Sequence, residues 1–218
     1  ANSLGSALVP ALSRAVGAGQ RKEVERNITL AIRFSMVVAI PAAVGLGVMA
    51  DPLIPLLFGK SELAVHIMQL GCLSVVLYSL STVSNAILQG TNHMQVPVMH
   101  AALSLGIHVL TLEVLLRIFE LGIVGVVIAD MVFALSMCIL NAASLHSLLH
   151  YRQEIRRSFF LPAFCAALMG LVTAGAKIFL KRFTGRVVLY TLVPIFLAVA
   201  VYGALLLLTG AIRENELL

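Results

Sequence analysis

The chain has 218 residues, of which 60% are hydrophobic and only 11% are charged, and its mean hydropathy is +1.02. Because a typical soluble domain is about a quarter charged, this composition excludes a water-soluble fold and predicts that lipid surrounds most side chains. The net charge of +5 does not indicate nucleic acid binding. The cations flank the apolar runs and form no basic stripe with aromatic residues, so they are explained by anchoring of helix ends.

The first apolar stretch, from Leu4 to Leu12, is too short to cross a bilayer, and no signal peptide pattern accompanies it. We interpret it as the end of a helix, reaching to about Ser13, whose beginning precedes this sequence. We therefore expect the chain to be the C-terminal part of a longer protein.

Six charge-poor segments follow, each close to or longer than the ~20 residues that a helix needs to cross the hydrocarbon core. Their predicted bounds are 27–50, 63–88, 96–116, 121–149, 158–180 and 187–209. They lack the alternation of a membrane barrel, and the linkers between them are short, the longest being residues 51–62. The predicted fold class is all-α, a polytopic transmembrane helix bundle.

Loop cations predict the orientation, because cytoplasmic loops are enriched in Lys and Arg. One set of loops carries eight cations and the other carries five. The larger set is Arg14, Arg21, Lys22, Arg26, Arg152, Arg156, Arg157 and Arg213; the smaller is Lys60, Arg117, Lys181, Arg182 and Arg186. We therefore expect the 151–157 loop and the C-terminus to be cytoplasmic.

Small residues and cysteines both lie inside the apolar segments. Small residues allow close helix contacts in lipid, and they recur at Gly45, Gly47, Gly122, Gly125, Ala163, Ala167 and Gly170. Cys72, Cys138 and Cys165 have no CxxC spacing, so they are interpreted as small core residues. The sequence predicts no metal site and no cofactor.

Several short motifs recur in a characteristic order. They are Pro10-Ala-Leu-Ser13 with a small-residue loop and the charged segment 21–26, then 40–47, 50–59, 85–90 and 121–129. Together they resemble the polysaccharide-flippase branch of the MATE-like (multidrug/oligosaccharidyl-lipid/polysaccharide) exporter superfamily. Within it they are most similar to the group of stage V sporulation protein B and the lipid II flippases.

The resemblance implies the C-terminal lobe of a two-lobe transporter with fourteen spans. Residues 1–149 would then hold the end of span eight and spans nine to twelve, and residues 150–218 two additional spans and a short cytoplasmic tail. These two spans would flank a groove for a lipid tail. Asp130 stands where the family usually has a small or hydroxylated residue, so no role is transferred to it.

The implied function is not enzymatic: a flippase that moves a lipid-linked saccharide, such as a peptidoglycan or polysaccharide precursor, across the bacterial cytoplasmic membrane by alternating access. Its partners would be that substrate, membrane lipids and the missing N-terminal lobe, in cell-wall, polysaccharide or sporulation biology. One alternative is an ion-coupled drug or cation antiporter of the same superfamily. Another is a membrane glycosyltransferase or polymerase, which requires an extramembrane loop or a carboxylate cluster.

Polar residues recur on one face of the 63–88 segment, at steps of four, three, four and four. They are Ser74, Tyr78, Ser81, Asn85 and Gln89. At about 100° per residue they form one stripe. The stripe is either a cavity wall that binds sugar hydroxyls or a face for hydrogen bonds between helices.

The next segment has a similar face with His100, Ser104, His108 and Thr111. Eight residues separate the two histidines, about 12 Å along a helix, which is too far for one metal ion. A polar packing face is favoured and a cavity wall is the alternative.

Ionisable residues within spans are informative because a charge at the bilayer centre costs about 2.5–3.5 kcal/mol or more. Arg33 lies about 9 Å inside its span and is expected either to snorkel or to bind a lipid phosphate. Asp130 lies about 12 Å beyond Gly122 and is expected to face the bundle interior, on the side of Asn141 and Ser144. There it would be an ion or proton site, or a partner of Arg33.

Three further expectations concern local geometry. Glu113 and Arg117 should pair at i, i+4, Lys177 should snorkel from its span end, and Pro41 should kink its helix. The candidates for the substrate or ion path are Arg33, Ser81, Asn85, Gln89, His108, Asp130 and Asn141.

Overall fold

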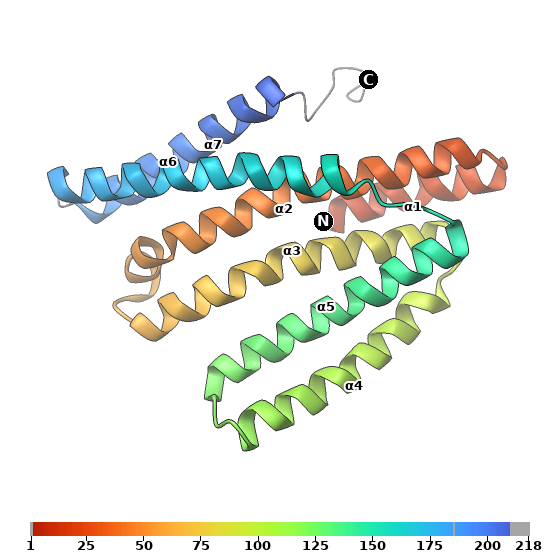
Figure 1. Cartoon of the computed structure of the whole chain (residues 1–218), viewed down its shortest axis with the longest axis horizontal. Helices are drawn as coiled ribbons and strands as arrows, with labels where there is room; N and C mark the ends of the chain where they lie inside the picture. Colours follow the sequence, from red (N-terminus) through yellow and green to blue (C-terminus); the bar gives the residue numbers. More distant parts are fainter. Residues whose placement is uncertain (1, 185, 210–218) are drawn as a thin grey trace. The chain divides into compact units, whose positions relative to one another are not determined.

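The computed structural model describes residues 2–184 and 186–209. The described chain is a succession of helices (Figure 1). They are α1 (Asn2–Gly17), α2 (Arg21–Phe58), α3 (Glu62–Gly90), α4 (Gln95–Arg117), α5 (Gly122–Leu149), the π-helix η1 (Arg156–Phe160), α6 (Leu161–Thr184) and α7 (Val187–Thr209).

Six of these helical segments are long and apolar enough to cross a membrane: α2, α3, α4, α5, η1 with α6, and α7. The predicted six spans and the all-α class are therefore confirmed, and the predicted partial first helix is α1. The chain is a multi-pass membrane protein. Arg213, one of the cations behind the predicted orientation, lies outside the described residues, and the orientation stays a prediction.

The predicted linker 51–62 is wrong, because α2 is 38 residues long and continues to Phe58 through Pro52 and Pro55. A proline removes one backbone donor and leaves the carbonyl four residues earlier without its helical partner. A helix tolerates this where another donor reaches that carbonyl. Only residues 59–61 join α2 to α3, and Gly59 turns the chain there with φ +86°.

Two tight turns end their helices by the same hydrogen-bond pattern. After α1, Gln20 N–H donates to the Ala15 carbonyl and Gly19, at φ +68°, donates to the Val16 carbonyl. Such a motif satisfies carbonyls at a helix end and needs a left-handed residue, which is most often glycine. Asn92 takes that place after α3, at φ +66°.

The described chain forms two compact units that interleave along the sequence. Unit 1 comprises Ala1–Met36 and Leu73–Glu154, and unit 2 comprises Val37–Cys72 and Ile155–Leu218. The helices α4 and α5 pack together in unit 1, as α6 and α7 do in unit 2. The division predicted between residues 149 and 150 stays a prediction.

Glycines lie at close helix contacts in both units. A Cβ added at Gly125 would lie 3.2 Å from Leu115 Cβ in unit 1, and one at Gly170 would lie 2.7 Å from Val44 Cγ1 in unit 2. These are two of the small residues that the sequence placed at helix contacts. Gly45, by contrast, has open space around it.

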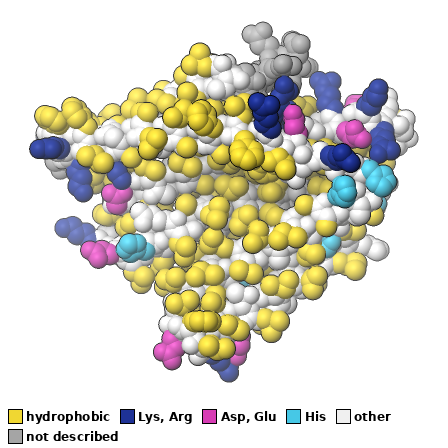
Figure 2. Space-filling model, viewed as in Figure 1, with side chains coloured by type: hydrophobic (Ala, Val, Ile, Leu, Met, Phe, Trp, Pro, Cys, Tyr) yellow, Lys and Arg dark blue, Asp and Glu magenta, His cyan; other side chains and the backbone are white. Residues whose placement is uncertain are grey.

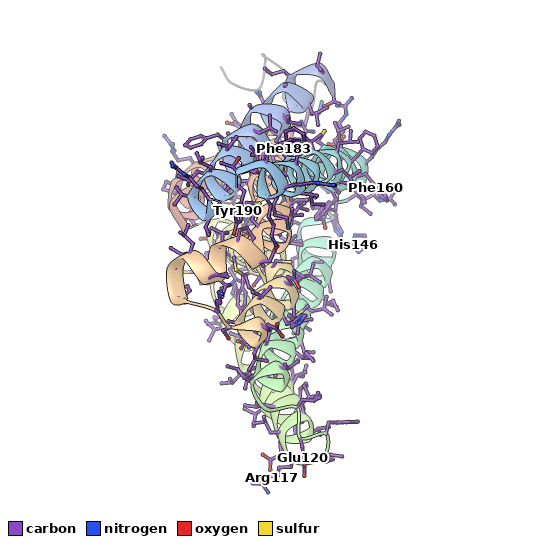
Figure 3. All side chains as sticks on the ribbon, turned by 90° about the vertical axis from the view of Figure 1, so that its left-hand side faces the viewer. Arg117, Glu120, His146, Phe160, Phe183 and Tyr190 are labelled. Carbon is purple, nitrogen blue, oxygen red and sulfur yellow. The ribbon has the colours of Figure 1, made fainter. Side chains whose placement is uncertain are left out.

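Charged and apolar side chains occupy different parts of the helices. Hydrophobic side chains spread over the visible face, while charged side chains gather near helix ends (Figure 2). Arg117 and Glu120 mark such an end, at the turn between α4 and α5, where both point away from the helices (Figure 3). The predicted pair is confirmed there, with Arg117 Nε 2.7 Å from Glu113 Oε1.

Candidate functional site

The centre of unit 1 is a buried polar network around Asn141 of α5, whose side chain is fully buried. Its Nδ2 donates to Asn85 Oδ1 of α3 at 2.8 Å and lies 3.5 Å from the Ser81 carbonyl oxygen. Its Oδ1 lies 2.8 Å from His100 Nδ1 of α4. One amide thus joins three helices.

The network orients the His100 ring. Asn141 Oδ1 accepts, since its Nδ2 donates to Asn85, and His100 Nδ1 therefore carries the proton. In the neutral ring Nε2 is then an acceptor, and Ser144 Oγ lies 3.3 Å from it. Both polar ends of the Asn141 amide and both ring nitrogens of His100 thus have partners, as polar groups away from water require.

The structure brings together three of the predicted path residues, Ser81, Asn85 and Asn141. Their contacts are hydrogen bonds between helices, which favours the second of the two interpretations of the α3 stripe. Gln89 takes no part and is exposed. On the α4 face, His100 contacts α5 and Ser104 is fully buried, which favours the packing interpretation for these two residues.

The prediction that Asp130 is buried in the bundle is wrong, because 53% of its side chain is exposed. Its Oδ1 lies 3.9 Å from Nδ1 of His108, a side chain that is 18% exposed. The His108 ring in turn meets the edge of Phe133, with ring centroids 6.0 Å apart. Asp130 does not pair with Arg33, which has another partner.

The reason for this exposure lies in the packing of α3 on α5. Asn141 and Asp130 share a face of α5, since eleven residues bring a helix back to nearly the same direction. The α3 helix covers that face from Asn141 to Phe133, where Tyr78 packs at a centroid distance of 6.3 Å. Asp130 lies nearly one turn farther along and is covered on one side by His108.

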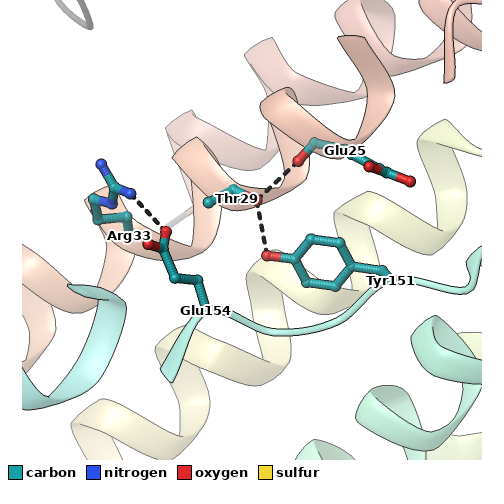
Figure 4. Close-up of polar contacts among 5 residues, drawn as sticks. All are labelled: Glu25, Thr29, Arg33, Tyr151 and Glu154. Carbon is teal, nitrogen blue, oxygen red and sulfur yellow. Dashed lines mark hydrogen bonds and ion pairs between the residues drawn. The ribbon is translucent and has the colours of Figure 1, made fainter. Parts of the chain in front are cut away.

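Arg33 is held by an ion pair and not by lipid. Its Nη2 lies 2.8 Å from Glu154 Oε2, and the Arg33 side chain is only 8% exposed (Figure 4). The ion pair is a third arrangement beside the two expected from the sequence, and the snorkelling and lipid phosphate interpretations stay predictions. The partner lies 121 positions away in the sequence, in the segment after α5, so no local pattern pointed to it.

One turn away, Thr29 ties the same segment to α2. Its Oγ1 lies 3.0 Å from Tyr151 Oη and donates to the Glu25 carbonyl at 2.9 Å (Figure 4). His150, at φ +51°, turns the chain so that Tyr151 reaches Thr29. Burial raises the pKa of the Tyr151 hydroxyl, with the Thr29 hydrogen bond opposing that shift.

Unit 2 contains an apolar groove of about 670 Å³ between α2, α6 and α7. Val38, Pro41 and Met49 line it from α2, Met169 from α6, and Val199 from α7. Its volume lies within the range of ~300–1,000 Å³ typical of ligand sites. The two additional C-terminal spans border this groove together with α2, and the groove for a lipid tail that the resemblance implies stays a prediction.

Two side chains of unit 2 bind backbone carbonyls of α2, and sequence reasoning missed both contacts. Tyr202 Oη donates to the Val37 carbonyl at 2.8 Å. Lys177 Nζ donates to the Val48 carbonyl at 2.8 Å and lies 2.7 Å from Asp51 Oδ1. The Lys177 side chain is 15% exposed and reaches the half-exposed Asp51, and its snorkelling stays a prediction. The α2 prolines are the signal that could have found these contacts, because each proline leaves the carbonyl four residues earlier without its helical donor.

Metal-ligand clusters and cysteines are the two remaining kinds of candidate site residue. Among the described residues, no group of three or more His, Cys, Asp or Glu side chains is placed to hold a metal ion. The three cysteines are free, and Cys138 and Cys165 are buried as predicted.

Comparisons with known proteins identify the family of the chain. Residues 1–114 match the MatE family. A Bdellovibrio bacteriovorus protein described as a probable lipid II flippase, MurJ, is 32% identical over 222 residues. The match covers 95% of this chain and 41% of that protein, so the chain spans less than half the length of this relative.

Proposed function

The chain belongs to the MatE family, and on that premise we propose that the full-length protein carries a lipid-linked saccharide from the inner to the outer leaflet. The chain is a multi-pass protein of the cytoplasmic membrane. The proposed substrate is a polyprenyl-linked precursor of peptidoglycan or of another surface polysaccharide. The missing N-terminal lobe would supply the other half of the path.

The observation that carries this proposal is the apolar groove of unit 2. A polyprenyl chain is a long hydrocarbon, and burying apolar surface is the main source of its binding free energy. The groove is lined mostly by aliphatic residues, with Thr173 and Tyr202 as polar exceptions. A small cationic drug would instead favour carboxylates or aromatic faces.

A second feature suits the headgroup of such a lipid. Arg14, Arg21, Lys22 and Arg26 are exposed around the start of α2, and Arg21 pairs with Glu25 at 3.4 Å. Exposed guanidinium and ammonium groups attract a diphosphate. These cations also fit the general enrichment of Lys and Arg in cytoplasmic loops, so they support the proposal less strongly than the groove does.

His108 and Asp130 are the proposed ion or proton site on this half of the protein. Asp130 is a half-exposed carboxylate on a membrane-spanning helix, a position at which a charge is costly unless it faces a polar path. His108 Nδ1 is buried and lacks a hydrogen-bond partner among the described residues. Asp130→Asn in the full-length protein should slow transport while protein abundance and unfolding temperature stay unchanged.

The antiporter is supported by the same pair, because His108 and Asp130 suit ion coupling whatever the cargo is. Two additional spans and an apolar groove favour the lipid-linked cargo. The enzyme alternative loses its support, since the described loops are short and the described residues include no metal-binding cluster of carboxylates.

The test is transport by the full-length protein in vesicles. A fluorescent lipid-linked saccharide is placed in both leaflets, and its exposure to a membrane-impermeant quencher is followed over time. We expect protein-containing vesicles to lose the protected fraction faster than protein-free vesicles. Equal rates in both, together with uptake of a cationic dye by the protein-containing vesicles, would establish the antiporter instead.

A further inference from the structure

The second half of α2 contains two prolines whose released carbonyls are both bound by side chains of α6 or α7. In a helix, the N–H of residue i donates to the carbonyl of residue i−4, and proline has no N–H. Pro41 therefore releases the Val37 carbonyl, and Pro52 releases the Val48 carbonyl. An unsatisfied carbonyl is very unfavourable in lipid.

Each of these two carbonyls has a donor from another helix. Tyr202 Oη of α7 donates to Val37 O at 2.8 Å, which we call the Pro41 contact. Lys177 Nζ of α6 donates to Val48 O at 2.8 Å, which we call the Pro52 contact. The third proline, Pro55, releases the carbonyl of Asp51, an exposed residue near the helix end, where water can bind it.

Both contacts lie beside the apolar groove. Val37, Pro41 and Tyr202 line the groove themselves. Val48 lies at the other end of the same stretch of α2. There Lys177 of α6 binds the Val48 carbonyl and lies 2.7 Å from Asp51 Oδ1. The wall of the groove that α2 provides is therefore attached to α7 at one end and to α6 at the other.

We propose that Tyr202 and Lys177 are positioning residues that set the width of this groove by binding the two carbonyls released by Pro41 and Pro52. The consequence for function rests on the proposed transport of a polyprenyl-linked substrate. A groove of fixed width binds a long hydrocarbon chain along its length. Loss of either contact lets α2 move away from its partner helix and weakens binding of the chain, without touching the headgroup.

The first measurement is the distance between spin labels at Val38 and Val199 in the full-length protein, two exposed residues that line the groove from α2 and α7. Tyr202→Phe is expected to lengthen and broaden the distance distribution. Tyr190→Phe is the matched control, since it removes a hydroxyl from α7 that has no hydrogen-bond partner among the described residues. For the Pro52 contact, Lys177→Met is compared with Lys181→Met, which alters an exposed lysine of α6.

A rescue variant separates positioning from general damage. Pro41→Ala restores the N–H that binds Val37 O within α2, so Tyr202→Phe should have a smaller effect in that background. If Tyr202→Phe acted only through a general loss of packing, its effect on the distance distribution would be the same with and without the rescue change Pro41→Ala. Equal effects in the two backgrounds, or an unchanged distance distribution in Tyr202→Phe, would overturn the proposal whether or not the protein transports a lipid-linked saccharide.

The second measurement is transport of two substrates with one headgroup, one carrying a long polyprenyl chain and the other a farnesyl chain. Tyr202→Phe should raise the apparent KM for the long chain about threefold, equivalent to the ~0.6 kcal/mol average for a hydrogen bond between membrane helices. The farnesyl substrate and kcat should be unaffected. Equal changes for both substrates would contradict positioning of the chain. No transport of either by the unmodified protein would refute the proposed function alone.

Discussion

In unit 1, polar side chains bind one another across helices, as the buried Asn141 and the part-buried Asn85 and His100 do. In unit 2, side chains of α6 and α7 bind the backbone of α2 at Val37 and Val48. Both arrangements supply hydrogen-bond partners to polar groups, which lipid tails cannot do. The first joins three helices through a single amide, whereas the second leaves an apolar groove beside the contacts. One unit therefore contains a polar network between helices, and the other contains an apolar groove, for which we propose a hydrocarbon ligand.

The largest effect should come from the amide that joins three helices. Asn141→Ala is expected to lower the free energy of unfolding by about 3 kcal/mol, because Asn85 and His100 each lose a partner and an unsatisfied buried group costs about 1–3 kcal/mol. Unfolding of the full-length protein in detergent micelles measures this. Gln89→Ala, on an exposed position of the same α3 stripe, should change stability by less than about 0.5 kcal/mol. Equal losses of unfolding free energy in the two variants would show that the Asn141 network stabilises unit 1 no more than an exposed polar residue does.

Close packing in unit 2 gives the next effect. An alanine at Gly170 would place a Cβ 2.7 Å from Val44 Cγ1, and such overpacking costs about 1–3 kcal/mol. Gly175→Ala on the same helix meets no atom within 4 Å and should be neutral or slightly stabilising. Val44→Ala should restore part of the stability lost in Gly170→Ala. Absence of that rescue would show that α2 and α6 do not meet at this point.

The ion pair of Arg33 and Glu154 in unit 1 should contribute less to the free energy of unfolding than the burial of Arg33 suggests. Arg33 is almost fully buried, but 39% of the Glu154 side chain is exposed to solvent, which screens the pair. A double-mutant cycle with Arg33→Met and Glu154→Gln should give a coupling free energy of about 1 kcal/mol. The pair Arg21 and Glu25, exposed on both sides, is the control and should give a smaller coupling. A larger value for the exposed pair would contradict this assignment.

The smallest effect is expected at Tyr151. Tyr151→Phe removes the hydrogen bond to Thr29 and should cost about 0.6 kcal/mol, the average for such bonds in a membrane protein. Burial raises the pKa of this hydroxyl in the folded state, so the unfolded state loses its proton first as pH rises. The native protein should therefore lose stability above about pH 10, the ordinary tyrosine value. The Tyr151→Phe variant should lose less stability over that pH range. An equal loss of stability in both proteins would mean that folding does not change the pKa of Tyr151.

The sequence predicted the spans well because bilayer thickness dictates a length and a composition for each of them. The polar face of α3 was also predictable, since its spacing matches the helical period, and so was the local pair of Glu113 and Arg117. The bounds of α2 were not. Pro52 and Pro55 fall within the predicted linker 51–62, although they lie inside α2. Lys177, 129 positions after Val48, satisfies one of the carbonyls that they release.

Asp130 shows why the burial of a side chain was harder to predict than the helix face on which it lies. Helical periodicity places it on the face of Asn141, and it is on that face, but the α3 side chains that cover Asn141 stop near Phe133. Arg33 illustrates the same difficulty, because its partner Glu154 comes from an irregular segment far along the chain. Which part of a helix face is covered depends on where neighbouring helices lie, and the period of a single helix does not contain that information.

The most direct test of the central claim is photo-crosslinking of a polyprenyl-linked saccharide to α7 in the full-length protein. A photoreactive residue is placed at Val199, which lines the groove, or at Phe196, which is equally exposed at a similar depth but does not line it. We predict labelling at Val199 that an excess of unlabelled long-chain substrate abolishes, and only weak, uncompeted labelling at Phe196. Equal labelling at both positions, unaffected by competitor, would show that the groove holds bulk lipid and would contradict the account.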